Sequence, residues 1–145
     1  MNLDNLDWKE YGYVGQTKQR GGAISLRPQL RVTLESGGRS LATLGLMDSG
    51  GDYTLINADI AEVLGIDLSK CLEVEIGGVV GTGIKARLAK VQISLDSIEE
   101  DFDVEARFVE DMPIDVILGQ HDFFTNFKVL FDREKLKFFL CRNHN

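Results

Sequence analysis

The alternation of apolar and polar positions predicts a chain made mostly of short β-strands. Apolar residues recur at every second position in residues 23–34, 72–76 and 102–109, which is the period of a half-buried strand. Residues 84–95 form a longer extended stretch, and residues 116–118 are apolar throughout, as in a fully buried strand. Short runs of glycine, aspartate and proline separate these segments, so we expect tight connections between the strands.

Helical patterns are few and short. Asn57 is placed as an N-cap before two helical turns at residues 58–64, and Gly65 follows as a C-terminal cap. A second short helix is predicted at residues 121–127, before a terminal hairpin over residues 129–140. Many strands, two short helices and little alternation of strand with helix predict a mainly β fold, either a small closed barrel or a sandwich.

Length, charge and cysteine content limit the class of partner. The 145 residues, 43% of them hydrophobic, suit one globular domain, which we place at residues 23–141 after an N-terminal arm at residues 1–22. With a net charge of -7 the chain gains nothing from phosphate contacts, so neither nucleic acid nor a membrane is expected as a partner. Cys71 and Cys141 lack metal-ligand spacing, so we expect no metal and a reducing, cytoplasmic compartment.

One turn carries an acid between two apolar strands. A predicted strand at residues 40–47 runs into the sequence Asp48-Ser49-Gly50, and a second strand at residues 54–56 leaves it. The apolar flanks would bury the base of the turn, and the glycine frees its backbone to present the carboxylate. The pattern therefore predicts a single acid held in a strand–turn–strand unit.

The same turn superficially resembles the nucleophile turn of trypsin-like serine proteases. That chemistry needs a histidine base to take the proton of the serine. In that family the base precedes the serine, whereas His121 and His144 both follow Ser49. We therefore prefer chemistry centred on the acid.

A glycine-rich stretch at residues 77–83 also has several interpretations. Residues 81–86 match the dinucleotide-binding fingerprint, but that fingerprint needs a crossover helix where residues 84–95 alternate as a strand. A change of parity between Leu88 and Val91 predicts a β-bulge in this strand. A glycine-rich tip between two extended segments predicts a mobile hairpin. The same pattern also allows an ordinary hairpin that has no function.

Peptide hydrolysis by carboxylates needs two of them around one water, one as general base and one as general acid. Asp48 is the single acid in such a turn, because the chain holds no second Asp-Ser-Gly and no Asp-Thr-Gly. An acid-protease mechanism would therefore take its second carboxylate from another copy. This predicts a two-fold homodimer with the site on its axis.

Three segments resemble, in the same order, those of retropepsin-like aspartic proteases, the single-domain dimeric relatives of pepsin. Residues 46–56 match the catalytic turn, residues 76–85 match the flap that closes over bound peptide, and residues 116–124 match the strand and helix that brace the catalytic loop. The resemblance covers roughly residues 28–140. It implies a small closed acid-protease barrel with a flap hairpin.

The resemblance also implies roles for individual residues. Asp48 would be the catalytic acid/base, and Ser49 would form a hydrogen bond across the dimer axis. Gly50 would let the backbone approach the carboxylate, while Gly51 and Asp52 would border the substrate cleft. Flap backbone groups would pair with an extended peptide. These flap residues are Gly77, Gly78, Val79, Val80 and Gly81.

The implied activity is that of an aspartic endopeptidase on peptide or protein substrates, working at mild acidity as a homodimer with water and no cofactor. The alternative is a catalytically weak module of the same fold that dimerises or binds peptides. The chain departs from the family in having Gly51 where alanine is usual, and two residues between Gly119 and Asp122 where many members have one. Interleaved terminal strands close the retroviral dimer, whereas this chain predicts a long arm and a terminal hairpin.

Overall fold

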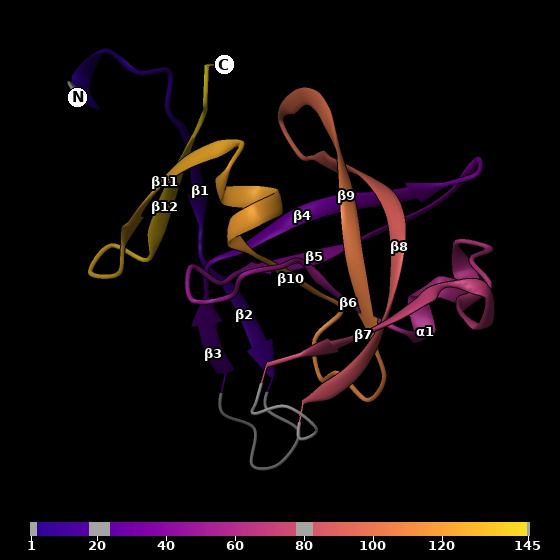
Figure 1. The fold of residues 1–145 in the computed structure, drawn as a ribbon. Helices are drawn as coiled ribbons and strands as arrows, with labels where there is room; N and C mark the ends of the chain where they lie inside the picture. The colour runs from indigo at the N-terminus through magenta and orange to yellow at the C-terminus, as the bar shows by residue number, and fades with distance from the viewer. Residues whose placement is uncertain (1–2, 18–23, 78–82, 145) are drawn as a thin grey trace.

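The computed structural model describes residues 3–17, 24–77 and 83–144 and shows a mainly β fold (Figure 1). The strands are β1 (Lys9–Gly12), β2 (Val14–Thr17), β3 (Ile24–Arg27), β4 (Gln29–Ser36), β5 (Arg39–Met47), β6 (Leu55–Asn57), β7 (Leu72–Ile76), β8 (Ile84–Leu95), β9 (Ile98–Val109), β10 (Val116–Leu118), β11 (Phe127–Asp132) and β12 (Lys137–Arg142). The helical segments are short: the 3-10 turns η1 (Leu3–Asn5) and η2 (Leu68–Lys70), the α-helix α1 (Asp59–Val63) and the π-helix η3 (Gln120–Phe124). In the described ranges, no helix is long and apolar enough to cross a membrane.

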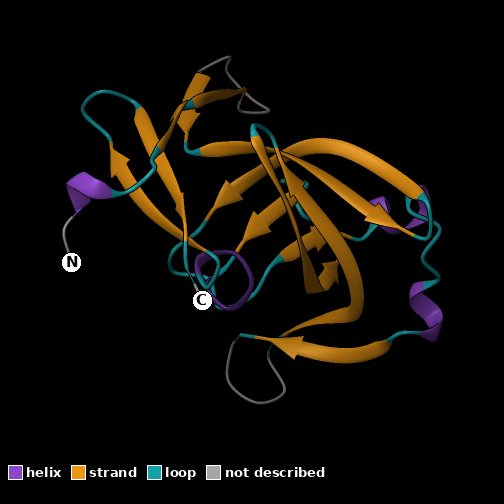
Figure 2. Ribbon diagram, turned by 90° about the horizontal axis from the view of Figure 1, so that it is seen from above, coloured by secondary structure: helices purple, strands orange, loops and turns teal. Residues whose placement is uncertain are grey.

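Within the described residues, six strands close into a barrel. They follow the order β4-β5-β10-β6-β9-β8, and β8 pairs back to β4 with Leu34 opposite Ile93. β7 continues the sheet beyond β8 and lies outside the closed ring. Figure 2 shows the curved strands enclosing the interior. The predicted closed barrel is confirmed, and the sandwich alternative is wrong.

The short strand β10 lies at the centre of this sheet, which explains its continuous apolar sequence. It pairs in parallel with β5 on one side and antiparallel with β6 on the other. Val116 and Leu118 are completely buried. Gly45 of β5 makes room for Leu118, since an added Cβ there would lie 3.1 Å from the Leu118 Cδ1 atom. The fully buried strand predicted for residues 116–118 is therefore confirmed.

Alternating side chains of the barrel strands fill the core. On β4, Leu30, Val32 and Leu34 are buried while Arg31 between them is exposed. Each such aliphatic side chain stabilises the fold by about 1.5–3 kcal/mol when fully buried. The core continues from the barrel into the C-terminal region through large aromatic side chains. These are Phe102, Phe108, Phe123, Phe127 and Phe138.

A separate sheet of three strands, in the order β1-β12-β11, joins the two ends of the chain and lies beside the barrel (Figure 1). The ring of Tyr11 on β1 stacks on Phe138 of β12 with 5.2 Å between ring centroids, and Tyr13 lies 6.3 Å from the same ring. The first strand is therefore packed against the end of the chain. The segment predicted as an arm at residues 1–22 contains β1 and β2, where the pattern predicted at most one strand.

Helix α1 ends as the sequence predicts. Gly65 has a φ of +69°, its amide donates to the Glu62 carbonyl at 3.1 Å, and the Ile66 amide donates to Ala61 at 2.9 Å. At the other end, the capping position falls on Ala58 and not on Asn57 as predicted. Asn57 still contributes, because its Oδ1 accepts the Asp59 amide at 3.0 Å.

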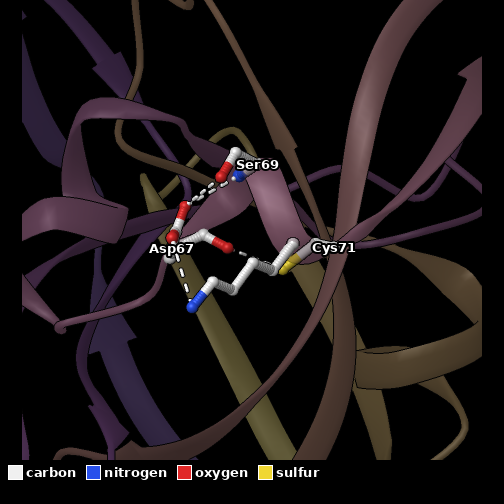
Figure 3. Close-up of polar contacts among 4 residues, drawn as sticks. Asp67, Ser69 and Cys71 are labelled. Carbon is white, nitrogen blue, oxygen red and sulfur yellow. Dashed lines mark hydrogen bonds and ion pairs between the residues drawn. The ribbon is translucent and has the colours of Figure 1, made fainter.

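The connection from α1 to β7 is the turn η2, held by Asp67 (Figure 3). Oδ1 of Asp67 accepts the Ser69 amide at 3.0 Å and the Ser69 hydroxyl at 2.6 Å, and its carbonyl oxygen accepts the Cys71 thiol at 3.4 Å. Lys70 lies 4.0 Å from the same carboxylate, but both side chains are exposed and this ion pair adds little. The turn therefore fixes where β7 begins.

The β-bulge predicted between Leu88 and Val91 is wrong. β8 pairs with β9 in continuous register from Arg87 to Ser94, and the shift comes between Ser94 and Leu95. The parity of buried positions changes because the first part of β8 pairs with β7 outside the barrel, while the second part lines the core. A change of environment along a strand of continuous register thus imitates the pattern of a bulge.

Tyr11→Phe should lower the free energy of unfolding by about 0.5–1.5 kcal/mol, because the Tyr11 hydroxyl donates to the Asp96 carbonyl at 3.0 Å. The pKa of Tyr11 is raised above its ordinary value of 10.0 by burial and, secondly, by the charge of Asp96. The folded chain therefore keeps this proton to higher pH than the unfolded chain, and the stability it provides is lost as pH rises beyond 10.

Denaturant unfolding of wild type, Tyr11→Phe and the control Tyr13→Phe between about pH 8 and pH 11 measures both effects. The loss of stability toward alkaline pH should be smaller in Tyr11→Phe than in the other two proteins. An identical alkaline slope in all three would contradict the role of this hydroxyl.

Candidate active site

Asp48 is the first residue after β5 and begins the turn that leads to β6. Its amide donates to the Leu118 carbonyl at 3.0 Å, so the central strand β10 holds the start of the turn. Oδ1 of Asp48 accepts the Gly50 amide at 3.0 Å, and the Asp48 carbonyl accepts the Gly51 amide at 3.1 Å. The side chain is exposed. The acid is therefore fixed by backbone groups and remains open to solvent.

The carboxylate lies directly against the two glycines. A Cβ built on Gly50 would lie 3.4 Å from Oδ1 of Asp48, and one on Gly51 would lie 3.2 Å from Oδ2. The alanine that the resemblance led us to expect at position 51 would therefore press against the carboxylate. Glycine leaves that side of the acid uncovered.

The π-helix η3 braces the turn from the other side. The Gln120 amide donates to the Gly51 carbonyl at 2.8 Å, and the His121 amide donates to the Asp52 carbonyl at 2.9 Å. The Gln120 side chain adds a third bond, from Nε2 to the Ser49 carbonyl at 2.7 Å. The first amides of a helix have no partner inside the helix, and here they satisfy the carbonyls of the acid-bearing turn.

Below the turn, Thr54 and Asp122 form a buried connection. The Thr54 amide donates to Oδ2 of Asp122 at 2.7 Å, and the Gly119 amide lies 3.4 Å from the Thr54 hydroxyl. Thr54 has an exposed fraction of 0%. Because the buried Thr54 amide needs an acceptor, the half-buried Asp122 carboxylate fixes the exit of the turn relative to η3.

Gly119 is where the backbone of the β10–η3 connection touches the turn. A Cβ at this position would lie 2.7 Å from the Tyr53 nitrogen and closer still to the Tyr53 carbonyl oxygen. The φ of Gly119 is -111°, so the need for glycine is steric and not conformational. No side chain fits between the two backbones.

The helix after Gly119 differs from the prediction in its bounds and type. It spans residues 120–124, not 121–127, and is a π-helix in which the Thr125 amide donates to the Gln120 carbonyl at 3.1 Å. A π-turn accommodates one residue more than an α-turn. The extra residue between Gly119 and Asp122 is thus absorbed locally, and Asp122 still reaches Thr54.

Three side chains near the turn were not found from the sequence: Gln120, Arg107 and Tyr53. The Arg107 Cζ atom lies 3.4 Å from the centroid of the Tyr53 ring, and the His121 ring lies 5.0 Å from the same centroid. Arg107 lies near the end of β9, where no local pattern marks it. Only the pairing of β9 with β6 brings it to the residue that follows Asp52.

The predicted flap is a hairpin of β7 and β8, with Ile76 opposite Ile84. Gly77 has a φ of +62°, and the Gly83 amide donates to Oε1 of Glu75 at 2.8 Å. β8 follows Gly83 directly as a strand, so the crossover helix of a dinucleotide site is excluded. The predicted residues Gly78, Val79, Val80 and Gly81 lie outside the described residues.

One face of this hairpin is charged and the other apolar. Glu73 lies 3.3 Å from Arg87 and 3.8 Å from Lys85 across the two strands. Leu72 and Ile84, on the opposite face, are among the most exposed large apolar side chains described. In the described ranges as a whole, this hairpin included, no group of three or more His, Cys, Asp or Glu side chains is placed to hold a metal ion.

Comparison with known proteins identifies the fold. No family model matches the sequence, and no curated protein matches it either. The chain is similar to the crystal structure of a retropepsin-like aspartic protease from Rickettsia conorii, with a TM-score of 0.58 and 18% identity over 93% of this chain and 96% of that one. The chain has a retropepsin-like fold. It also aligns with the retroviral protease-like domain of Ddi1 from Leishmania major, with a TM-score of 0.45 and 19% identity over 73% of this chain and 82% of that one.

The retropepsin-like fold agrees with the local geometry described above. An acid-bearing turn, a central apolar strand and a short helix come from three separate segments, and the backbone bonds of Asp48, Gly51 and Gln120 join them. At 18% identity the similarity concerns the fold. What the site does must be argued from its own residues.

Gly119→Ala should destabilise the fold by about 3 kcal/mol or more, because the new methyl group collides with backbone atoms of Tyr53 that cannot move away. Denaturant unfolding measures the loss. Gly12→Ala is the matched control, since an added Cβ there meets nothing within 4 Å. Equal stability of the two variants would show that the β10–η3 connection does not touch the turn.

Asp122→Ala should cost about 1–3 kcal/mol, because it leaves the buried Thr54 amide without its acceptor. Amide hydrogen exchange at Thr54 should become faster together with exchange at Gly51. Asp103→Ala, an exposed position on β9, serves as the control and should leave both rates unchanged. Unchanged exchange at Thr54 in Asp122→Ala would contradict the proposed connection.

Proposed function

We propose that this chain is an aspartic endopeptidase that hydrolyses peptide bonds with a water molecule activated by paired Asp48 carboxylates of a homodimer. The observation that supports this most is the placement of Asp48: an exposed acid, fixed at the head of a braced turn, in a retropepsin-like fold. A structural aspartate in a surface turn would not need a central strand and a helix to hold its turn.

The chemistry follows from two carboxyl groups that share one proton, since two carboxylates about 3 Å apart do not both ionise readily. The ionised group takes a proton from water, and the water oxygen attacks the carbonyl carbon of the peptide. The protonated group donates its proton to the carbonyl oxygen. The carboxyl group that took the proton from water then gives it to the leaving amine as the carbon–nitrogen bond breaks. The other carboxylate takes a hydroxyl proton from the tetrahedral intermediate, so the product is a carboxylic acid and the pair again shares one proton.

A single chain supplies half of this arrangement. Asp48 is the one acid of the sequence in an Asp-Ser-Gly or Asp-Thr-Gly turn. Ser49 and Gly50 follow it and are also exposed, so the turn can meet a second copy of itself. We propose that Ser49 bonds across the axis and that Gly50 lets its backbone amide hold the Asp48 carboxylate, as it does in the single chain.

The proposed substrate is an extended peptide bound between the turn and the flap hairpin. Gly51 and Asp52 would border the cleft, and Gly77 at the base of the flap would present its backbone groups together with the glycine-rich tip. Backbone pairing of this kind recognises peptide geometry more than side-chain identity. We therefore propose unfolded or flexible protein segments as the substrate class.

Asp48→Asn should reduce cleavage of an unfolded protein such as reduced casein by about 10²–10⁴-fold or more, because the amide cannot act as general base. The substitution should leave the fold intact, since the side chain is exposed and the amide oxygen can still accept the Gly50 amide. Cleavage is measured between about pH 4 and pH 7.5, where a shared-proton pair operates. Asp103→Asn, also exposed, is the control and should cleave like wild type.

The outcomes separate the proposal from its alternative. Equal cleavage by wild type and Asp48→Asn would point to a contaminating protease and overturn the assignment. No cleavage by dimeric wild type at any pH in this range would favour the alternative, a retropepsin-fold module that dimerises or binds peptides without catalysis.

A further inference from the structure

The strand β11 is an open edge of the three-stranded sheet. The order of this sheet is β1-β12-β11, so β12 has a neighbour on both sides and β11 has one. Figure 1 shows β11 and β12 as the hairpin beside β1, away from the barrel. Among the described residues, no strand pairs with the outer side of β11. An unpaired edge of this kind is a template for another strand.

The N-terminal strand is not free to fill this edge. β1 pairs with β12 of its own chain, with Tyr11 opposite Phe138. Glu10 and Lys137 form an ion pair at 3.1 Å across the same two strands. Interleaving of terminal strands between two copies, as in the retroviral dimer, would require these contacts to break. Two edges of this sheet stay open, the outer sides of β1 and β11. β11 is the longer strand and, unlike β1, carries exposed large apolar side chains, so any sheet between two copies is expected to use β11.

The backbone of β11 presents bonding groups outward at defined positions. The Asn143 amide donates to the Asn126 carbonyl at 2.8 Å, which marks this pair as hydrogen-bonded. Bonded and non-bonded pairs alternate in an antiparallel ladder, so Val129 and Phe131 turn their amides and carbonyls away from β12. The residues whose backbone groups turn toward β12 are Lys128, Leu130 and Asp132.

The side chains at this edge are unusually exposed for their type. Leu130 has an exposed fraction of 41% and Phe131 of 40%. They are adjacent in the middle of an edge strand and point to opposite faces of the sheet. A strand added to this edge would cover both of them.

We propose that two copies of this chain pair antiparallel through β11 around a two-fold axis at Leu130. This inference rests on the proposed function, in which the site is incomplete without a second Asp48. In this register Val129 of one copy and Phe131 of the other exchange amide–carbonyl hydrogen bonds, and Lys128 lies opposite Asp132 of the second copy.

Charge decides among the registers that the backbone allows. With the axis at Val129, Lys128 would lie opposite Leu130, and with the axis at Phe131, Leu130 would lie opposite Asp132. With the axis at Leu130, opposite charges meet twice by symmetry and the two Leu130 side chains meet each other. Opposite-charge and apolar cross-strand pairs stabilise a sheet, so this register is the favoured one.

The Lys128 ammonium and the Asp132 carboxylate can each form a further hydrogen bond to the second copy. Lys128 donates to Oδ1 of Asn143 at 2.7 Å, and Oδ1 of Asp132 accepts the Lys135 amide at 3.0 Å. An ammonium carries three donors and a carboxylate has two oxygens. Both side chains can therefore keep their contacts within the chain and also meet across the interface.

Oxidative cross-linking tests the register. In a non-bonded antiparallel pair the Cα atoms lie about 4.5 Å apart, which is within the range of a disulfide. Leu130→Cys should therefore form a disulfide-linked dimer under mild oxidation in a Cys71→Ser background. Phe131→Cys is the matched control. In this register residue 131 of one copy lies diagonal to residue 131 of the other, about 7–8 Å away, so the two new cysteines are beyond disulfide reach. Equal cross-linking of the two variants would overturn the proposed register.

Analytical ultracentrifugation tests the interface without cross-linking. Lys128→Glu and Leu130→Asp, which place like charges opposite each other, should each weaken dimerisation by about tenfold or more. The double variant Lys128→Glu with Asp132→Lys should regain affinity relative to Lys128→Glu. Val63→Asp, an exposed apolar position on α1, and Lys135→Glu in the β11–β12 turn are the controls and should dimerise like wild type.

The readouts distinguish this inference from the proposed function. A wild type that cleaves casein while Leu130→Asp stays dimeric and active would overturn the β11 interface and leave the proposed function standing. A dimer that Leu130→Asp dissociates, but that cleaves nothing at any pH, would support the interface and count against the proposed function. A wild type that is monomeric at all concentrations up to about 1 mM would overturn the inference, since even weak specific pairing is populated there.

Discussion

The arrangement of the candidate site depends on the contact between two backbones at Gly119. Because no side chain separates Gly119 from Tyr53, the strand β10 can end directly against the acid-bearing turn. The amides that follow Gly119 then reach the carbonyls of Gly51 and Asp52. A wider spacing would break these bonds together, since they all cross the same gap. The steric freedom of one glycine therefore positions the whole turn.

The same constraint explains why an extra residue in η3 is tolerated. The first turn of the helix and the Asp122 carboxylate must both stay in reach of the turn, at Gly51 and at Thr54. Inserting a residue into an α-helix would rotate one of these contacts away by about 100°. A π-turn widens the helix at that point and keeps both contacts. The helix is therefore irregular because its contacts to Gly51 and to Thr54 are both fixed, while the segment that makes them contains one extra residue.

The contacts between the two ends of the chain bear on the form that the proposed homodimer can take. The first strand is bound to the last one by ring stacking on Phe138 and by the Glu10–Lys137 ion pair. Those contacts belong to a single copy and need no partner. Among the edges they leave open, β11 has apolar side chains at its centre and opposite charges near its ends. An edge of this composition is self-complementary in a single antiparallel register.

The sequence by itself determined the elements whose signals are local. Alternating and continuous apolar runs located the barrel strands, and the positive φ of Gly65 follows from its place after an apolar helix. Asp48 was found because a short motif lay between apolar strands. The residues around Asp48 were not found from the sequence, since Arg107 and Gln120 reach the turn only through strand pairing and helix packing. The bulge was misplaced because parity records which face is buried, and only the closure of the barrel decides that face.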